Sequence, residues 1–522
     1  MKKNRLARFF LTNASGIFLS RIFGFLRDAL QAAILGTSIY SDIFFIAFKF
    51  PNMFRRVVSE GAFVQSFLPF LLSARNKGAF SLSIFVIFIL GLLTLTGLVL
   101  CFAPFITKLL ALGYDESRIS LALPLVKIHF WYLLLIFIVT YFSALLQYRQ
   151  HFWVGAYNTV LLNLAMIFAL LFAKAENLDL LEATYVLSYS VLVGGVCQII
   201  LHFYPLYSQG LWRLQALGLL RIKKWRRQSG LRLGLKGLYF EKPDSVTPAI
   251  FAKAKARILG LLADLRLFFK AFIPAMLGAS SAQLIALIDS SLVTLLPDST
   301  GGVSVLNFAN RIFQLPLALF AIAISSALFP LIARSLKDGN LDLALQNLKT
   351  AFWFLLITLS LCVLGGYIMR NEIVWLLFER GNFNRADTLA VAAAFVGYML
   401  GLLPFGLVKI FSLWLYATKK QAKAAKFSVI ALLVGTILAG GFILTLRYGE
   451  ITNGLLWDLR YFFIAMAGSI SGFVLLGLTL REFGLARFLA ILFDKRRALL
   501  LLTLLCITFV LLEALRRLFA IS

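Results

Sequence analysis

The chain has 522 residues, a formal net charge of +28, a hydrophobic content of 61% and a mean hydropathy of +0.90. Soluble domains average roughly 45–50% apolar residues, so this composition excludes an ordinary soluble protein. The basic residues fall mostly between apolar runs, where anionic headgroups and the positive-inside rule account for them. We therefore expect anionic membrane lipids, and no nucleic acid, as partners of this charge.

Apolar runs of about 20 residues recur along the whole chain, as expected for membrane-spanning helices. The ten-residue alternation of a membrane β-barrel is absent. We predict an all-α polytopic membrane protein with about thirteen transmembrane helices. The predicted spans are residues 13–36, 41–73, 79–106, 119–147, 152–174, 182–208, 271–297, 302–334, 344–369, 387–417, 422–447, 457–481 and 496–517.

The segments between these spans alternate in charge. Basic segments such as MKKNRLAR, ARNKG and ATKKQAKAAK alternate with short neutral or mixed ones such as LGTSIY and PDSTGG. This pattern predicts a cytoplasmic N-terminus and, with thirteen spans, an external C-terminus. The first residues resemble a signal n-region, but no uncharged stretch with a cleavage site follows them.

Residues 209–270 form the longest basic segment and divide the chain. Six spans precede it and seven follow. Its tryptophans and leucines fit amphipathic helices on an anionic inner leaflet, and a solvated, partly disordered linker fits equally well. The predicted organisation is an N-terminal lobe at 1–208, this segment at 209–270, a C-terminal lobe at 271–481, and an amphipathic segment with the last helix at 482–522.

The two halves of the chain resemble each other at a constant offset of 261 residues. This offset relates Asp28 to Asp289, and Pro69 to Pro330. We therefore expect two pseudo-symmetric lobes in a parallel repeat, with a binding site between them. Chance similarity between apolar helices is the alternative.

Residues suited to metal or redox chemistry are sparse. The four cysteines lie far apart in apolar runs, and the three histidines show no metal-ligand spacing. The chain has no DxD or HExxH motif. We predict no metal site, no cofactor and no enzymatic activity.

The first two predicted spans are unusually rich in charge. Each charged residue at a helix centre costs about 2.5–3.5 kcal/mol on insertion scales, so these groups should line a polar space inside the bundle. Five basic and three acidic residues leave a net charge of +2, which an anion would offset. The guanidinium fork suits a phosphate or pyrophosphate. The charged and amide residues of this set are Arg21, Arg27, Asp28, Asp42, Lys49, Asn52, Arg55, Arg56 and Glu60.

Charge pairing that is purely structural is the alternative for any one of these residues. In the second half, Arg311 could reach the same cavity from the opposite side. Asp289 could bind a coupling cation or pair with a neighbour.

Four stretches carry a family resemblance. They read SRIFGFLRDALQAAILG, SDIFFIAFKFPNMFRRVVSEGAFVQSFLPFL, NFANRIFQLPLAL and LFERGNF. These resemble the MurJ (MviN) family of lipid II flippases, within the multidrug/oligosaccharidyl-lipid/polysaccharide exporter superfamily. The resemblance covers most of the chain up to about residue 480.

The resemblance implies two lobes around a central cationic cavity, alternating access, and a bacterial inner-membrane location. It implies transport of lipid II, the undecaprenyl-pyrophosphate disaccharide-pentapeptide, to the outer leaflet for peptidoglycan synthesis, with cell-wall synthesis machinery as a further candidate partner. By motif position, the implied cavity residues are Ser20, Arg21, Arg27, Asp28, Asp42, Arg55, Glu60 and Arg311.

This chain departs from the family pattern in two respects. The family usually has fourteen spans, of which the last two shape a lipid-tail groove, whereas thirteen are found here. Some relatives also have a sodium site with acids on two helices, and the span at 422–447 contains no acid. Coupling to the membrane potential or to a monovalent cation is therefore left open, as are the oligomeric state and the peptide variant of the substrate.

Two other functions compete with lipid II transport. The first is export of another undecaprenyl-pyrophosphate-linked oligosaccharide on the same fold. The second is a membrane-bound lipid-sugar enzyme, against which the missing acid and histidine motifs argue.

Overall fold

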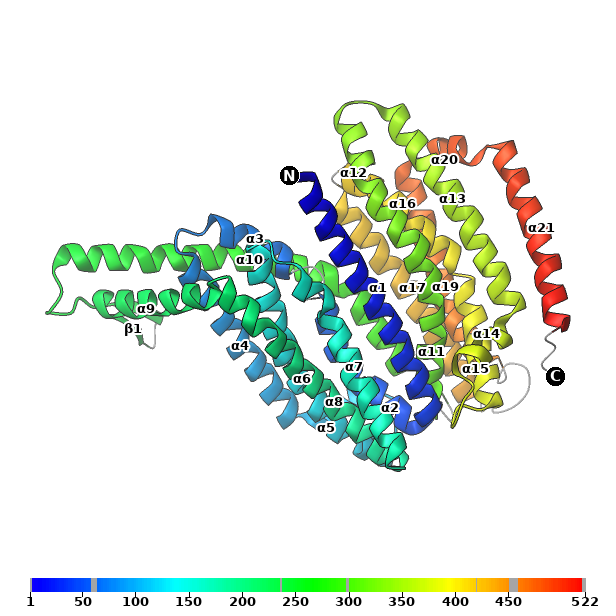
Figure 1. Ribbon diagram of the computed structural model, residues 1–522, viewed down its shortest axis with the longest axis horizontal. Helices are drawn as coiled ribbons and strands as arrows, with labels where there is room; N and C mark the ends of the chain where they lie inside the picture. Colours follow the sequence, from blue (N-terminus) through cyan, green and yellow to red (C-terminus); the bar gives the residue numbers. More distant parts are fainter. Residues whose placement is uncertain are drawn as a thin grey trace. The chain divides into compact units, whose positions relative to one another are not determined.

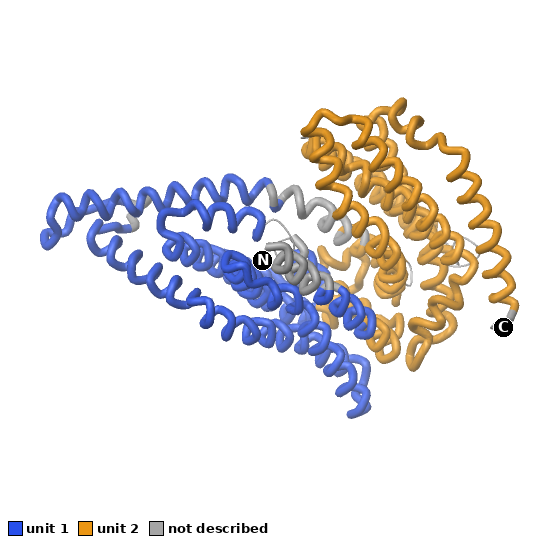
Figure 2. The backbone as a smooth tube through the Cα atoms, turned by 45° about the horizontal axis from the view of Figure 1, so that its top comes forward, with its two compact units in different colours: residues 1–27, 47–106, 123–283 blue, residues 28–46, 107–122, 284–522 orange. Residues whose placement is uncertain are grey.

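The computed structural model describes residues 2–57, 63–234, 237–296, 300–418, 420–449 and 459–518. Its described part is almost entirely helical, with one two-stranded antiparallel sheet. The chain divides into two compact units, which Figure 2 distinguishes by colour. Unit 1 comprises residues 1–27, 47–106 and 123–283, and unit 2 comprises residues 28–46, 107–122 and 284–522.

Five helices contribute residues to both units. They are α1 (Lys2–Leu35), α2 (Ile39–Val57), α5 (Ala103–Leu110), α6 (Glu116–Tyr148) and α10 (Pro248–Val293).

The remaining elements of unit 1 are α3 (Phe63–Ser73), α4 (Lys77–Cys101), α7 (Trp153–Ala175), α8 (Leu180–Ser208), α9 (Leu211–Ser229), β1 (Leu231–Gly234) and β2 (Gly237–Phe240). Its core is rich in phenylalanine. Phe63, Phe67, Phe80, Phe137 and Phe268 are all fully buried, and the ring centroids of Phe63 and Phe67 lie 5.1 Å apart. Such offset aromatic contacts add stabilisation to the area that they bury.

Unit 2 contains the remaining helices (Figure 1). They are α11 (Gly302–Pro316), the π-helix η2 (Leu317–Ile322), α12 (Ala323–Lys337), α13 (Leu341–Ile368), α14 (Arg370–Phe378), α15 (Arg385–Met399), α16 (Leu402–Ala417), α17 (Gln421–Tyr448), α19 (Arg460–Phe483), α20 (Leu485–Leu492) and α21 (Lys495–Leu518). The π-helix begins directly after Pro316, which lacks a backbone donor and so disturbs the regular helical ladder. Helix α19 packs against α15, α16 and α17, and α21 packs against α13.

Ten helices in the described residues are long and apolar enough to cross a membrane. They correspond to predicted spans three to six and eight to thirteen. The all-helical polytopic fold is thus confirmed, whereas the count of thirteen spans stays a prediction. The first two predicted spans are not among the ten, and their charges lower the hydropathy of α1 and α2.

The segment at 209–270 is structured in its described part. Helix α9 is followed by the β1–β2 hairpin, in which Leu231 pairs with Phe240, and then by the first half of α10. Figure 1 shows α9 and this half of α10 running side by side. The disordered-linker alternative was therefore wrong for these residues. Helix α10 also continues through residue 270, so the predicted lobe boundary there lies inside one helix and stays a prediction.

Candidate functional site

In unit 1, α7 holds the part of α1 that carries the first two predicted arginines. The Arg27 guanidinium donates a hydrogen bond to Asn163 Oδ1 at 3.1 Å, and Asn163 Nδ2 donates to the Ser20 carbonyl at 3.1 Å. One α7 amide thus contacts two of the four predicted residues on α1, Ser20 and Arg27. Arg21 is exposed on the same helix.

The predicted residues of α2 in unit 1 are Lys49, Asn52, Arg55 and Arg56. The Arg55 guanidinium donates from Nε and Nη2 to Asn52 Oδ1, at 3.2 and 3.1 Å. This contact orients the Arg55 guanidinium. Lys49 is half-buried.

In unit 2, Asp28 and Arg311 form an ion pair. Arg311 Nε lies 2.6 Å from Asp28 Oδ2, and the Asp28 side chain is only 7% exposed. Arg311 was predicted from its position in the sequence, and the structure pairs it with Asp28, which was also predicted. The two charges compensate each other in this contact, as the structural alternative for such pairs requires.

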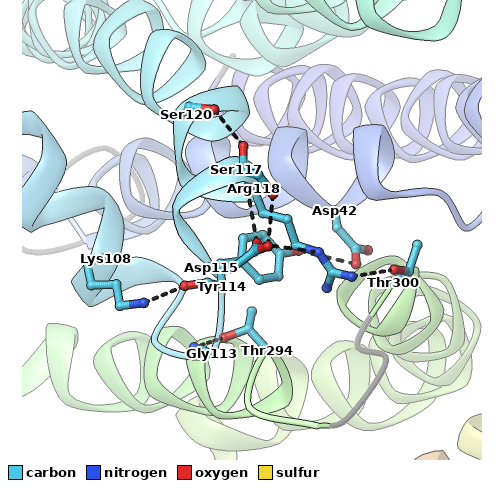
Figure 3. A network of polar contacts seen from close by, with 10 residues as sticks. All are labelled: Asp42, Lys108, Gly113, Tyr114, Asp115, Ser117, Arg118, Ser120, Thr294 and Thr300. Carbon is cyan, nitrogen blue, oxygen red and sulfur yellow. Dashed lines mark hydrogen bonds and ion pairs between the residues drawn. The ribbon is translucent and has the colours of Figure 1, made fainter.

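Asp42 is fully buried at the N-terminus of α11. The backbone N–H of Ser304 donates to Asp42 Oδ1 at 2.7 Å, and the Ser304 hydroxyl donates to the same oxygen. The Tyr114 hydroxyl donates to Oδ2 at 3.4 Å (Figure 3). Helix N-termini carry a partial positive charge, so this carboxylate is stabilised by the α11 dipole as well as by its hydrogen bonds.

The segment between α5 and α6 and the first turn of α6 make further contacts near this carboxylate, which Figure 3 shows. Gly113 N–H donates to Thr294 Oγ1 at 2.9 Å, and Arg118 Nη2 donates to Thr300 Oγ1 at 3.2 Å. Burial raises the pKa of Tyr114, and the Asp42 carboxylate raises it further. Tyr114 therefore stays protonated near neutral pH and can act as the donor.

Three predictions fall on residues that cannot be placed. Glu60 lies outside the described residues, and only the backbone is described for Arg56 and Asp289. Of the predicted residues between 42 and 60, the structure therefore describes the side chains of Asp42, Lys49, Asn52 and Arg55. The role of every predicted site residue, including the possible cation site at Asp289, stays a prediction.

Sequence reasoning missed Asn163, Tyr114 and Ser304, each of which contacts a predicted residue. A signal existed for two of them. Ser304 lies seven residues before Arg311 and so shares its helix face, and Asn163 is a polar residue within an apolar run. Tyr114 lies in a short connecting segment, and nothing there indicated burial.

The family model described as Lipid II flippase MurJ matches residues 31–521 of this chain. The chain belongs to this family. A probable lipid II flippase MurJ of Helicobacter pylori strain J99 is 46% identical over 485 residues, which cover 93% of this chain and 96% of that protein. A probable lipid II flippase MurJ of Rhizobium tropici is 30% identical over 443 residues, covering 83% of this chain and 75% of that protein.

Two solved structures share the fold. One is titled a lipid II flippase MurJ in an inward closed conformation, with a TM-score of 0.70 and 21% identity, covering 98% of this chain and 100% of that one. The other is an inward-facing multidrug resistance MATE family transporter of the MOP superfamily, with a TM-score of 0.64 and 13% identity, covering 90% and 97%. The predicted MurJ family is thus confirmed, and the two structures show that the fold is shared. This member is a multi-pass protein of the bacterial inner membrane.

Proposed function

We propose that this chain is a flippase that moves lipid II from the cytoplasmic to the outer leaflet of the inner membrane. Membership in the MurJ family carries this proposal, through a relative that is 46% identical over nearly its whole length. The proposed activity is transport without covalent chemistry.

The pyrophosphate of the substrate is the group that the arginines would bind. Arg27 and Arg55 are each held by a neutral amide, from Asn163 and Asn52. These contacts orient the two guanidinium groups. Bidentate N–H donation to phosphate oxygens is geometrically specific, and Arg supplies it better than Lys. Arg21, exposed on α1, would add a third donor group.

The transport cycle that we propose is alternating access driven by charge. The pyrophosphate enters from the cytoplasm and offsets the repulsion among the arginines, after which the site opens to the outside. A negative interior favours outward movement of an anion by about 2.3 kcal/mol per charge per 100 mV. The same field favours inward return of the empty, positively charged site. We also propose that a monovalent cation bound at Asp289 couples to this cycle. The transport assay described next tests this coupling.

Reconstituted protein with labelled lipid II tests the proposal. Leaflet exposure of lipid II is measured with and without a membrane potential. Arg27→Ala or Arg55→Ala should reduce transport at least about tenfold, since a hydrogen bond to a charged group contributes about 1.5–3 kcal/mol. Arg481→Ala removes an exposed arginine at the end of α19 and should leave transport unchanged. Wild-type transport by the Arg27 and Arg55 variants would remove these residues from the mechanism.

The assay also separates the alternatives. Transport of another undecaprenyl-pyrophosphate-linked oligosaccharide, with no transport of lipid II, would assign a different substrate to the same mechanism. Turnover of a lipid-linked sugar by the purified protein in detergent would identify an enzyme instead. In cells, depletion should cause lipid II accumulation and lysis, rather than loss of surface polysaccharide alone.

A further inference from the structure

The corner between α8 and α9 in unit 1 carries an apolar cleft. Its volume is about 430 Å³, and its lining residues are Phe203, Tyr204, Tyr207 and Trp212. Tyr204 and Tyr207 are 77% and 76% exposed. The cleft lies at the end of a predicted span, where aromatic residues mark the membrane interface.

Trp212 forms a fixed wall of this cleft. Its indole Nε1 donates to the Phe203 carbonyl at 3.4 Å, and its ring centroid lies 5.7 Å from Phe142 and 5.8 Å from Phe203. The Phe142 ring comes from α6, so two helices orient the indole. A wall of this kind preserves the shape of the cleft, which reduces the ordering cost when a ligand binds.

The orientation of α9 is also determined by its packing. Leu211, Gly218, Trp225 and Ser229 are buried on one face. A Cβ on Gly218 would lie 2.3 Å from the Gly78 carbonyl oxygen, so α9 and α4 approach through their backbones. Further along, Trp225 clusters with Ala79 and Ile258. The opposite face of α9 is consequently held outward.

That outward face changes character along the helix. Its exposed stripe begins next to the cleft and follows three- and four-residue spacing, so its members share one side of α9. The order is one cation, two leucines and two cations: Arg213, Leu217, Leu220, Lys224 and Arg227. Residues 209–270 contain fourteen Lys and Arg against three Asp and Glu. One of these acids, Glu241, pairs at 2.8 Å with Arg232, which is not part of the stripe.

We propose that the α8–α9 corner binds an anionic glycerophospholipid, with an acyl chain in the aromatic cleft and the phosphate on Arg213, at the start of the exposed stripe. The two features occur together, and each supplies what the other lacks. An apolar cleft alone selects no headgroup, and a basic stripe alone selects no lipid. Basic residues near a membrane surface contribute about 1 kcal/mol each toward anionic lipid, so the combination favours an anionic over a zwitterionic headgroup.

An acidic polypeptide is the competing occupant of a basic surface. It would use the cations but would leave the aromatic cleft and the leucines of the stripe without a role. An anionic lipid at the corner uses the cleft and Arg213, and an anionic membrane surface uses the leucines and the remaining cations of the stripe. The site involves none of the residues assigned to the transported substrate, so it stands or fails independently of the proposed flippase activity.

Tryptophan quenching in nanodiscs tests the site with full-length protein. Phosphatidylglycerol or phosphatidylcholine with brominated acyl chains is titrated into a phosphatidylcholine background, and Trp212→Phe is subtracted to isolate one of eight tryptophans. We expect half-maximal quenching of Trp212 at a mole fraction at least about threefold lower for the anionic lipid. In Arg213→Glu/Leu217→Gln/Lys224→Glu the two lipids should quench alike.

A matched charge reversal supplies the control. Arg481→Glu/Lys495→Glu/Arg496→Glu alters three exposed cations in unit 2 and should keep the wild-type preference. Soluble glycerol phosphate should not reverse the quenching, because the acyl chain is part of the ligand. Equal quenching by both lipids in the wild-type protein, or a preference that survives the stripe substitutions, would overturn the proposal. Binding of polyglutamate that the stripe substitutions abolish, with no lipid preference, would assign the surface to acidic polypeptides.

Discussion

At the scale of single residues, the predicted charged side chains contact partners of different chemistry. Asp28 meets a cation, Arg311, whereas Arg27 and Arg55 contact neutral amides. Composition and spacing predicted that these residues avoid lipid, because an isolated charge in hydrocarbon is costly. They did not predict the partners, since Asn163 and Ser304 lie more than 130 residues from the groups they contact.

Ser304 provides a test of the buried Asp42 carboxylate. Ser304→Ala removes the hydroxyl donor and keeps the backbone donor, so the free energy of unfolding should fall by about 0.5–1.5 kcal/mol, the net contribution of a typical hydrogen bond. Thermal unfolding in detergent would show this as a lower Tm. Ser304→Thr keeps the hydroxyl and serves as the control. Equal Tm values for wild type and Ser304→Ala would mean that the hydrogen bond from the hydroxyl to Asp42 contributes nothing to the free energy of unfolding.

At the scale of elements, packing between helices depends on glycines that hydropathy does not distinguish from other apolar positions. Gly218→Ala places a methyl group against the Gly78 carbonyl and should destabilise the α4–α9 contact by about 1–3 kcal/mol. Gly260→Ala in α10 meets nothing within 4 Å and should be neutral or stabilising by up to about 1 kcal/mol. Unfolding midpoints of the two variants check this, and the opposite order would contradict the packing.

The turn before α21 provides a pH-dependent contact. The backbone N–H of Arg497 lowers the pKa of Asp494, and Lys349 from α13 lowers it further. A folded-state pKa below the unfolded value of about 3.9 stabilises the fold above that pH. This contribution is lost as pH falls through the folded pKa.

The difference in Tm between wild type and Asp494→Asn should therefore be full at pH 7 and shrink below about pH 4. Asp338→Asn, at an exposed aspartate after α12, is the matched comparison. A difference between wild type and Asp494→Asn that grew on acidification would contradict the sign of the pKa shift.

At the scale of the whole molecule, the alternation of basic and neutral connecting segments predicts the orientation in the membrane. In a variant with Cys101, Cys197, Cys362 and Cys506 replaced by Ala, one new cysteine is introduced at a time. Glu176→Cys should react with an impermeant maleimide in intact cells, whereas Lys337→Cys should react only after permeabilisation. The reverse result would invert the topology and place the N-terminus outside.

The sequence by itself determined the membrane class, the helical fold and the family, since these depend on hydropathy and on local motifs. It also located the charged residues of α1 and α2, because a charge in an apolar run is visible without coordinates. Only the tertiary structure decided which of them are paired and that residues 209–270 fold back as helix, hairpin and helix. Both outcomes depend on contacts between distant residues, which composition and periodicity do not encode.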